Sequence, residues 1–186
     1  MLVHAAGSGV GTAVIQLARA AGAQVFGTSR TSDKLERARG YGLRNTVVVN
    51  DDPKIFAAAA SEWTAGRGVN VVIDLVGSAY LDANLSALAQ KGRMVFVGTT
   101  SGAKATLDFA TVMRKRLTVI GTMLRGRSAE EKATATRLFA EHVVPLLADG
   151  TVRPVVDRVY KLDEVREAHL RMESNESFGK IVLLVD

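Results

Sequence analysis

A run of small residues near the start of the chain, Ala5-Ala6-Gly7-Ser8-Gly9-Val10-Gly11-Thr12, has the composition of a phosphate-binding turn. Small side chains let the backbone turn sharply and let a phosphate approach the main chain. If a helix follows, its free N–H groups and its dipole attract the anion. The match to G-x-G-x-x-G is incomplete, because Ala6 and Ser8 stand at the first two glycine positions and only Gly11 fits the third. The alternative to a dinucleotide site is a purely structural tight turn.

A basic group of residues follows the next apolar run. In sites for NADH, an acidic residue at the end of the second strand usually binds the ribose 2′-hydroxyl. Here the chain reads Ser29-Arg30, with Lys34 one helical turn later and no carboxylate at the strand end. A hydroxyl, a guanidinium and an ammonium suit a dianionic phosphate. The sequence therefore predicts NADPH rather than NADH, against the alternative of an ordinary basic helix start.

Apolar runs alternate with helical patterns over most of the chain. The expected strands are residues 2–5, 24–28, 46–50, 69–75, 93–97 and 117–122, with helices 10–21, 32–39, 54–64, 81–89 and 109–114 between them. Strands without polar alternation are buried on both faces, and strands separated by helices are parallel neighbours. Right-handed crossovers then give an α/β fold, a doubly wound parallel sheet (Rossmann fold) with helices on both faces.

The end of the chain departs from this alternation. It predicts one long helix over residues 129–147, bent or ended near Pro145, then a strand at 155–160, a helix at 162–172 and a final strand at 181–185. We therefore divide the chain into a Rossmann domain of residues 1–150 and a C-terminal segment of residues 151–186.

Composition excludes several classes of function. The chain has 186 residues, no cysteine and three scattered histidines, so we expect no disulfide, no thiolate nucleophile and no metal site. Its apolar runs are too short to cross a membrane, and no secretory signal begins it, so a cytoplasmic protein is expected. The net charge of +5 comes from dispersed cations, and aromatic residues are only 5%, so we expect a solvated surface with one anion site and no nucleic-acid partner.

Five stretches carry a resemblance to a known family. They are residues 4–13, 66–77, 92–98, 124–128 and 178–183, in that order along the chain. The first resembles the nucleotide loop of zinc-independent quinone oxidoreductases, which are NADPH-dependent members of the medium-chain dehydrogenase/reductase superfamily close to zeta-crystallin. The others are similar to later signatures of the same family.

The resemblance implies a role for each part of the cofactor site. It assigns the pyrophosphate to Ser8, Gly9, Val10 and Gly11; the 2′-phosphate to Ser29, Arg30 and Lys34; the nicotinamide-ribose side to Gly77, Val97 and Gly98; the carboxamide to the backbone of Met123 and Leu124; and the last cofactor strand to Phe178, Gly179 and Lys180. One position departs from the family, because Asp51 stands where relatives often carry a tyrosine against the adenosine. That carboxylate must point away from the phosphate or weaken NADPH binding.

The implied reaction is hydride transfer from NADPH to a quinone or an enone. In full-length relatives a GroES-like catalytic domain precedes the glycine loop. By this resemblance, we expect that domain to be absent from this chain and the segment 151–186 to belong partly to it. We therefore expect weak NADPH binding and little or no quinone turnover by the isolated chain. No catalytic residue is assigned: His4, His142 and His169 fit packing or surface positions, and Asp74 either touches the site or bonds backbone N–H groups.

An apolar strand at residues 117–122 should lie at the edge of the sheet, where it invites pairing with another chain. In the resembling family this strand pairs across a dimer, so a homodimer is expected. Two other functions remain open. One is an enoyl-reductase domain of a fatty-acid or polyketide synthase, and the other is a non-enzymatic NADPH-binding module.

Overall fold

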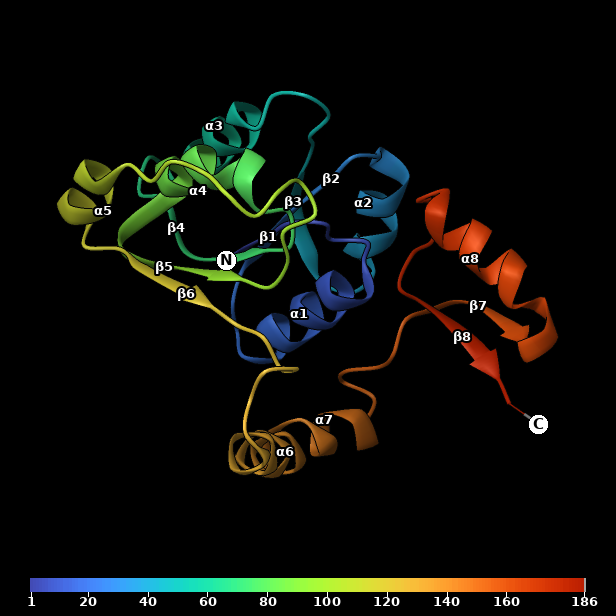
Figure 1. The fold of residues 1–186 in the computed structure, drawn as a ribbon. Helices are drawn as coiled ribbons and strands as arrows, with labels where there is room; N and C mark the ends of the chain where they lie inside the picture. Colours follow the sequence, from blue (N-terminus) through green and yellow to red (C-terminus); the bar gives the residue numbers. More distant parts are fainter. Residues whose placement is uncertain (186) are drawn as a thin grey trace.

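A six-stranded parallel sheet forms the centre of the protein, whose computed structural model describes residues 1–185. The strand order is β3-β2-β1-β4-β5-β6, so the order reverses between β1 and β4 (Figure 1). The strands are β1 (Leu2–Val3), β2 (Val25–Ser29), β3 (Leu43–Val48), β4 (Val69–Asp74), β5 (Leu88–Phe96) and β6 (Thr118–Gly121). The doubly wound parallel sheet expected from the sequence is confirmed, and β6 lies at its edge.

Helices cover both faces of this sheet. One face carries α1 (Gly9–Ala20) and α2 (Ser32–Arg39), and the other carries α3 (Lys54–Trp63), α4 (Leu81–Ala87) and α5 (Phe109–Lys115) (Figure 1). The short strand β1 separates the two cores, since Leu2 packs with Phe56 on one face and Val3 packs with Ile15 on the other. Alternate strand residues point to opposite faces, so a strand buried on both sides is apolar throughout.

Several element boundaries differ from the sequence prediction; β3, for example, covers Leu43–Val48 and not residues 46–50. Strand β5 begins at Leu88, before the expected turn, and accommodates Lys91 in the left-handed region at φ 60°. The expected long helix is two helices. The first, α6 (Ala129–His142), ends before Pro145, and the second, α7 (Val144–Ala148), contains it. Pro145 therefore lies in the first turn of α7, where a missing backbone N–H costs nothing.

The C-terminal segment forms its own small unit. Strands β7 (Val156–Lys161) and β8 (Lys180–Leu184) are parallel, and α8 (Val165–Glu173) follows a 3₁₀ turn at Leu162–Glu164 and connects them. The Asp157 carboxylate joins this unit to the Rossmann domain, since it accepts a 3.1 Å bond from Arg171 and lies 3.9 Å from Arg37. Within residues 1–185, no helix is long and apolar enough to cross a membrane.

Candidate cofactor-binding site

The glycine turn joins β1 directly to α1, as its composition predicts. Ser8 is the N-cap of α1, and its Oγ accepts a hydrogen bond of 2.9 Å from the Gly11 N–H. Gly11 lies so close to the backbone of the turn that a Cβ there would meet the carbonyl oxygen of Ala5 and come within 2.8 Å of that of Ala6. The third glycine of the motif is therefore required by the close packing of the helix against the turn that precedes it. A helix N-terminus in this position attracts anions in general.

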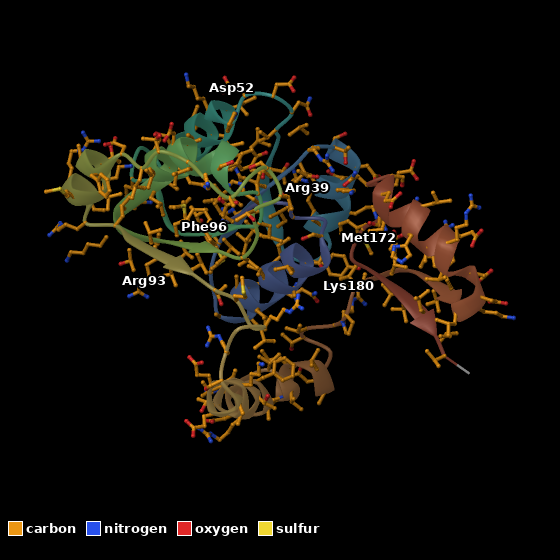
Figure 2. The ribbon with its side chains drawn as sticks, in the orientation of Figure 1. Arg39, Asp52, Arg93, Phe96, Met172 and Lys180 are labelled. Atoms are coloured by element: carbon orange, nitrogen blue, oxygen red, sulfur yellow. The ribbon has the colours of Figure 1, made fainter. Side chains whose placement is uncertain are left out.

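The segment 178–180 lies against the glycine turn. The Gly179 N–H donates to the Gly7 carbonyl at 2.8 Å, and Ser8 and Gly179 form a parallel bridge. Lys180 begins β8 (Figure 2), and its side chain lies over Gly9, where a Cβ would collide with it. Phe178 differs from its neighbours, because its ring is buried in the core of the α1–α2 face. Phe178 thus supports the turn from within, while Lys180 presents its side chain to it.

The three residues predicted to bind the 2′-phosphate come together in one cavity. Ser29, Arg30 and Lys34 line a cavity of about 440 Å³ at the carboxyl end of β2. The opposite wall comes from the C-terminal segment, through Ser174, Asn175 and Glu176. The Lys34 ammonium donates a hydrogen bond to the Asn175 carbonyl, which connects the two walls. The sequence analysis missed this second wall; its only local signal was the polar stretch at residues 173–177 before Phe178.

Charges of both signs line this cavity, because the carboxylates of Asp33 and Glu176 lie in its wall together with Arg30 and Lys34. Burial, followed by repulsion from Arg30, lowers the pKa of Lys34, while Asp157 acts in the opposite direction. The carboxylate of Glu176 is neutralised by Arg171, whose Nη1 lies 2.6 Å away. A bound dianion would relieve the repulsion between Lys34 and Arg30, so the cavity suits a phosphate.

A second group of predicted residues gathers at the carboxyl ends of β4 and β5. The Asp74 carboxylate accepts hydrogen bonds from the N–H groups of Val76 at 2.7 Å and Gly77 at 3.0 Å. The main-chain carbonyl of Asp74 accepts bonds from Val97 at 2.7 Å and Gly98 at 3.3 Å. Of the two roles left open for Asp74, the structure shows the bonding to backbone N–H groups. Gly77, Val97 and Gly98 are thereby brought together.

Other residues lie as follows. Met123 and Leu124 follow the carboxyl end of β6, and their exposed fractions are 70% and 64%. Asp51 is exposed in the turn between β3 and α3. His4 is fully buried between the rings of Phe56 and Tyr80.

His142 and His169 are exposed. Among residues 1–185, no three His, Cys, Asp or Glu side chains gather in an arrangement able to hold a metal ion.

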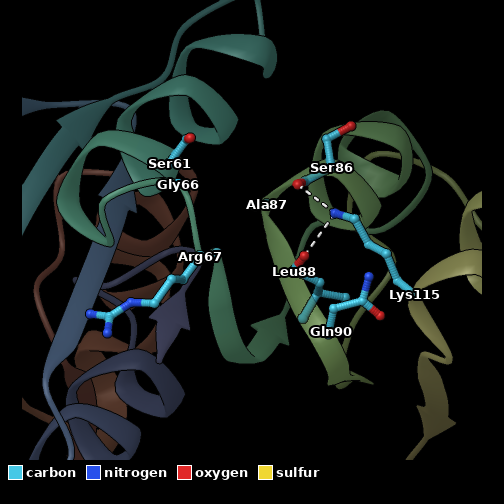
Figure 3. A pocket seen from close by; sticks show the side chains of 9 residues that line it. Ser61, Gly66, Arg67, Ser86, Ala87, Leu88, Gln90 and Lys115 are labelled. Atoms are coloured by element: carbon cyan, nitrogen blue, oxygen red, sulfur yellow. Dashed lines mark hydrogen bonds between the residues drawn. The ribbon is translucent and has the colours of Figure 1, made fainter.

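A second cavity, of about 170 Å³, lies at the opposite end of the strands, where β4 and β5 begin (Figure 3). Both cationic side chains that line it already have partners. The Lys115 ammonium donates to the carbonyls of Leu85, Ser86 and Leu88 at 2.7–2.9 Å, and Arg67 Nε donates to the Thr64 carbonyl at 3.1 Å. Ligands of open α/β sheets bind at the carboxyl ends of the strands, near the point where strand order reverses. The cavity beside β2 and the glycine turn fits that rule, and this one does not.

A glycine turn at the point where the strand order reverses defines a nucleotide-binding domain. A family model for zinc-binding dehydrogenases matches residues 9–141, so the chain belongs to that family.

Three relatives refine this assignment. A probable quinone oxidoreductase of Schizosaccharomyces pombe is 30% identical over 99% of this chain and 54% of its own length. The structure of Escherichia coli quinone oxidoreductase complexed with NADPH is 30% identical, with a TM-score of 0.79 over 99% of this chain and 56% of that one. Highly-reducing polyketide synthase 1 of Aureobasidium melanogenum is 29% identical over 98% of this chain and 8% of its own length.

The likeness to quinone oxidoreductases confirms the resemblance seen in the sequence motifs. The chain spans about half the length of these oxidoreductase relatives.

Proposed function

We propose that this chain is the NADPH-binding domain of a quinone oxidoreductase, an enzyme that transfers a hydride from NADPH to a quinone or an enone. The observation that carries the proposal is the cavity in which Ser29, Arg30 and Lys34 meet beside the glycine turn. The Escherichia coli relative, which is named as an NADPH complex, supports the choice of cofactor.

NADPH would supply the hydride, and the chain would bind and orient it. The turn from Ser8 to Gly11 would hold the pyrophosphate with its free N–H groups. Gly77, Val97 and Gly98 would line the nicotinamide ribose, and the backbone of Met123 and Leu124 would hold the carboxamide. The start of α1 at Gly9, with the side chain of Lys180 lying over it, is consistent with this fit.

The domain division belongs to the same proposal. Residues 1–150 would form the cofactor domain, and residues 151–186 would partly serve a GroES-like catalytic domain. The support is that relatives are about twice as long as this chain. The isolated chain should then bind NADPH weakly and turn over little or no quinone; robust turnover by this chain alone contradicts the division.

We also propose a homodimer that forms through β6, together with a cytoplasmic location. All four residues of β6 are exposed at the edge of the sheet. An edge strand with Val119 and Ile120 exposed offers free backbone groups and apolar side chains to a second copy.

An enoyl-reductase domain of a polyketide synthase is the second candidate, favoured by the match to such a synthase over nearly the whole chain. The segments 74–77 and 124–125 resemble quinone reductases more closely, which favours the first candidate. The coding sequence upstream of Met1 discriminates the two: a single catalytic domain supports an oxidoreductase, and synthase modules support the alternative. A short intact gene whose product binds NADPH without turnover supports a non-enzymatic module.

Calorimetric titration of the chain with NADPH and with NADH tests the cofactor assignment. Lys34→Met should weaken NADPH binding about tenfold and leave NADH binding unchanged, because only NADPH places a phosphate beside this ammonium. The control is Arg67→Met, which removes a positive charge beside the other cavity, at the amino end of β4 and away from β2. Equal losses for both cofactors in Lys34→Met, or no NADPH binding by the wild-type chain, contradict the proposal.

A further inference from the structure

A chain of hydrogen bonds runs through the interior from β2 to β4. The Thr28 hydroxyl lies 2.8 Å from Nδ1 of His4, whose Nε2 lies 2.6 Å from Oδ1 of Asn84. Nδ2 of Asn84 then donates to Oδ2 of Asp74 at 2.9 Å. These four side chains, which we term the buried network, are each at most 1% exposed. Such burial is tolerated only where every polar atom has a partner.

The direction of each bond in the buried network follows from its last member. An ionised Asp74 can only accept, so Asn84 must turn its amide N–H toward Asp74 and its carbonyl toward His4. His4 must then carry its proton on Nε2, and Nδ1 accepts from the Thr28 hydroxyl. Burial lowers the pKa of His4 to about 4, although the bond to Asn84 opposes this, so the neutral ring persists near neutral pH.

Asp74 is the point at which the buried network meets the carboxyl edge of the sheet. Its other carboxylate oxygen holds the N–H groups of Val76 and Gly77, and its carbonyl holds those of Val97 and Gly98. Gly77 has φ 96° and is enclosed, since a Cβ there would lie 2.8 Å from the Gly102 carbonyl. The conformation of the loop at Gly77 therefore depends on the Asp74 carboxylate.

We infer that Asp74 is a positioning residue for the nicotinamide half of NADPH. It holds Gly77, Val97 and Gly98 where they line the ribose, and Asn84 and His4 fix the rotamer of its carboxylate. This inference rests on the proposed function. Asp74 itself does not need to touch the cofactor. Its effect should therefore fall on the nicotinamide half of the ligand and leave the adenosine half untouched.

Two ligands separate these halves. NADPH carries both, whereas 2′,5′-ADP carries the adenosine, the 2′-phosphate and one further phosphate only. Asp74→Ala should weaken NADPH binding about tenfold, the equivalent of one or two lost hydrogen bonds, and leave 2′,5′-ADP binding within twofold of wild type. Asp74→Asn keeps an acceptor for Gly77 and should restore most of the NADPH affinity.

Gln16→Ala is the matched control. Gln16 is also a buried polar side chain with three hydrogen bonds, to Thr12 and to both main-chain groups of Arg153. Its loss should lower stability without changing the ratio of the two affinities. If Asp74→Ala weakens the binding of both ligands equally, or changes neither affinity, the positioning role is overturned while the proposed function stands. If the wild-type chain binds neither ligand, both proposals fall.

The tautomer of His4 provides a test that does not depend on the stability of Asp74→Ala. In Asp74→Asn the new amide oxygen must accept the hydrogen bond from the Gly77 N–H, so its N–H₂ faces Asn84. Asn84 then turns over, and His4 must move its proton from Nε2 to Nδ1. Imidazole ¹⁵N chemical shifts should show Nε2–H in the wild type and Nδ1–H in the variant. The same tautomer in both proteins overturns the network and the role we derive from it.

Discussion

At the scale of single residues, His4 makes the stability of the protein depend on pH. In the unfolded chain this imidazole takes up a proton near its ordinary pKa of 6.5, but burial lowers the pKa in the folded state to about 4. The unfolded state therefore binds more protons between these values, and stability falls as the pH falls through this window. A difference of this size corresponds to on the order of 3 kcal/mol for a fully buried group.

His4→Gln removes this titration while keeping an amide that can bond Asn84. Urea unfolding should show that the stability advantage of wild type over variant is about 2 to 3 kcal/mol larger at about pH 7 than at about pH 4.5. The comparison between variants is needed because burial raises the pKa of Asp74, which gives a contribution of opposite sign. Parallel pH profiles for the two proteins contradict this account.

Residue types alone predicted part of the candidate site. The glycine turn and the group Ser29, Arg30 and Lys34 were readable because their chemistry and order along the chain suffice. The cavity wall at Asn175 was not, since it depends on a contact between Lys34 and a segment far along the chain. Nor was the pairing of Asn84 with His4, because a helix and a strand meet there only after folding.

At the scale of elements, the end of α4 depends on a side chain from α5. The Lys115 ammonium donates to the carbonyls of Leu85, Ser86 and Leu88 at the C-terminus of α4; Figure 3 shows the bonds to Ser86 and Leu88. Helix C-termini carry unpaired carbonyls and partial negative charge, which a cation stabilises. Lys115→Met should therefore lower the free energy of unfolding by about 1 to 2 kcal/mol in urea titrations.

The neighbouring Arg114→Met is the control for this prediction. Arg114 lies on the same helix, but among residues 1–185 its guanidinium bonds only the Thr111 hydroxyl, at 3.2 Å, at the surface. Its loss should change stability by less than about 0.5 kcal/mol. Equal effects of the two substitutions would show that Lys115 acts as an ordinary surface charge.

Most elements were predictable because the spacing of apolar residues and the presence of turn residues can be seen within a short stretch of sequence. Helix α2 begins and ends where the sequence indicates, at Ser32 and Arg39. The errors arose where the decision was not local. Strand β5 extends back to Leu88 because it pairs with Val69 of β4, and the break between α6 and α7 lies at Val143 rather than at the proline.

At the scale of the whole molecule, the exposed edge of β6 predicts a homodimer. Light scattering should give twice the chain mass of 19.8 kDa. Val119→Lys should shift the protein toward the monomer, since a charge on an edge strand opposes pairing. Val144→Lys, at a similarly exposed position on α7, should leave the dimer intact. A monomeric wild type, or equal effects of both changes, contradicts the interface.

The most direct test of the whole account concerns the 2′-phosphate at the end of β2. Calorimetry should give the ratio of NADH to NADPH dissociation constants for the wild-type chain and for Ser29→Asp. We expect the wild type to favour NADPH and Ser29→Asp to favour NADH, because a carboxylate repels the phosphate and binds the ribose hydroxyls. The same ratio in both proteins would contradict the assignment of this cavity to the NADPH phosphate.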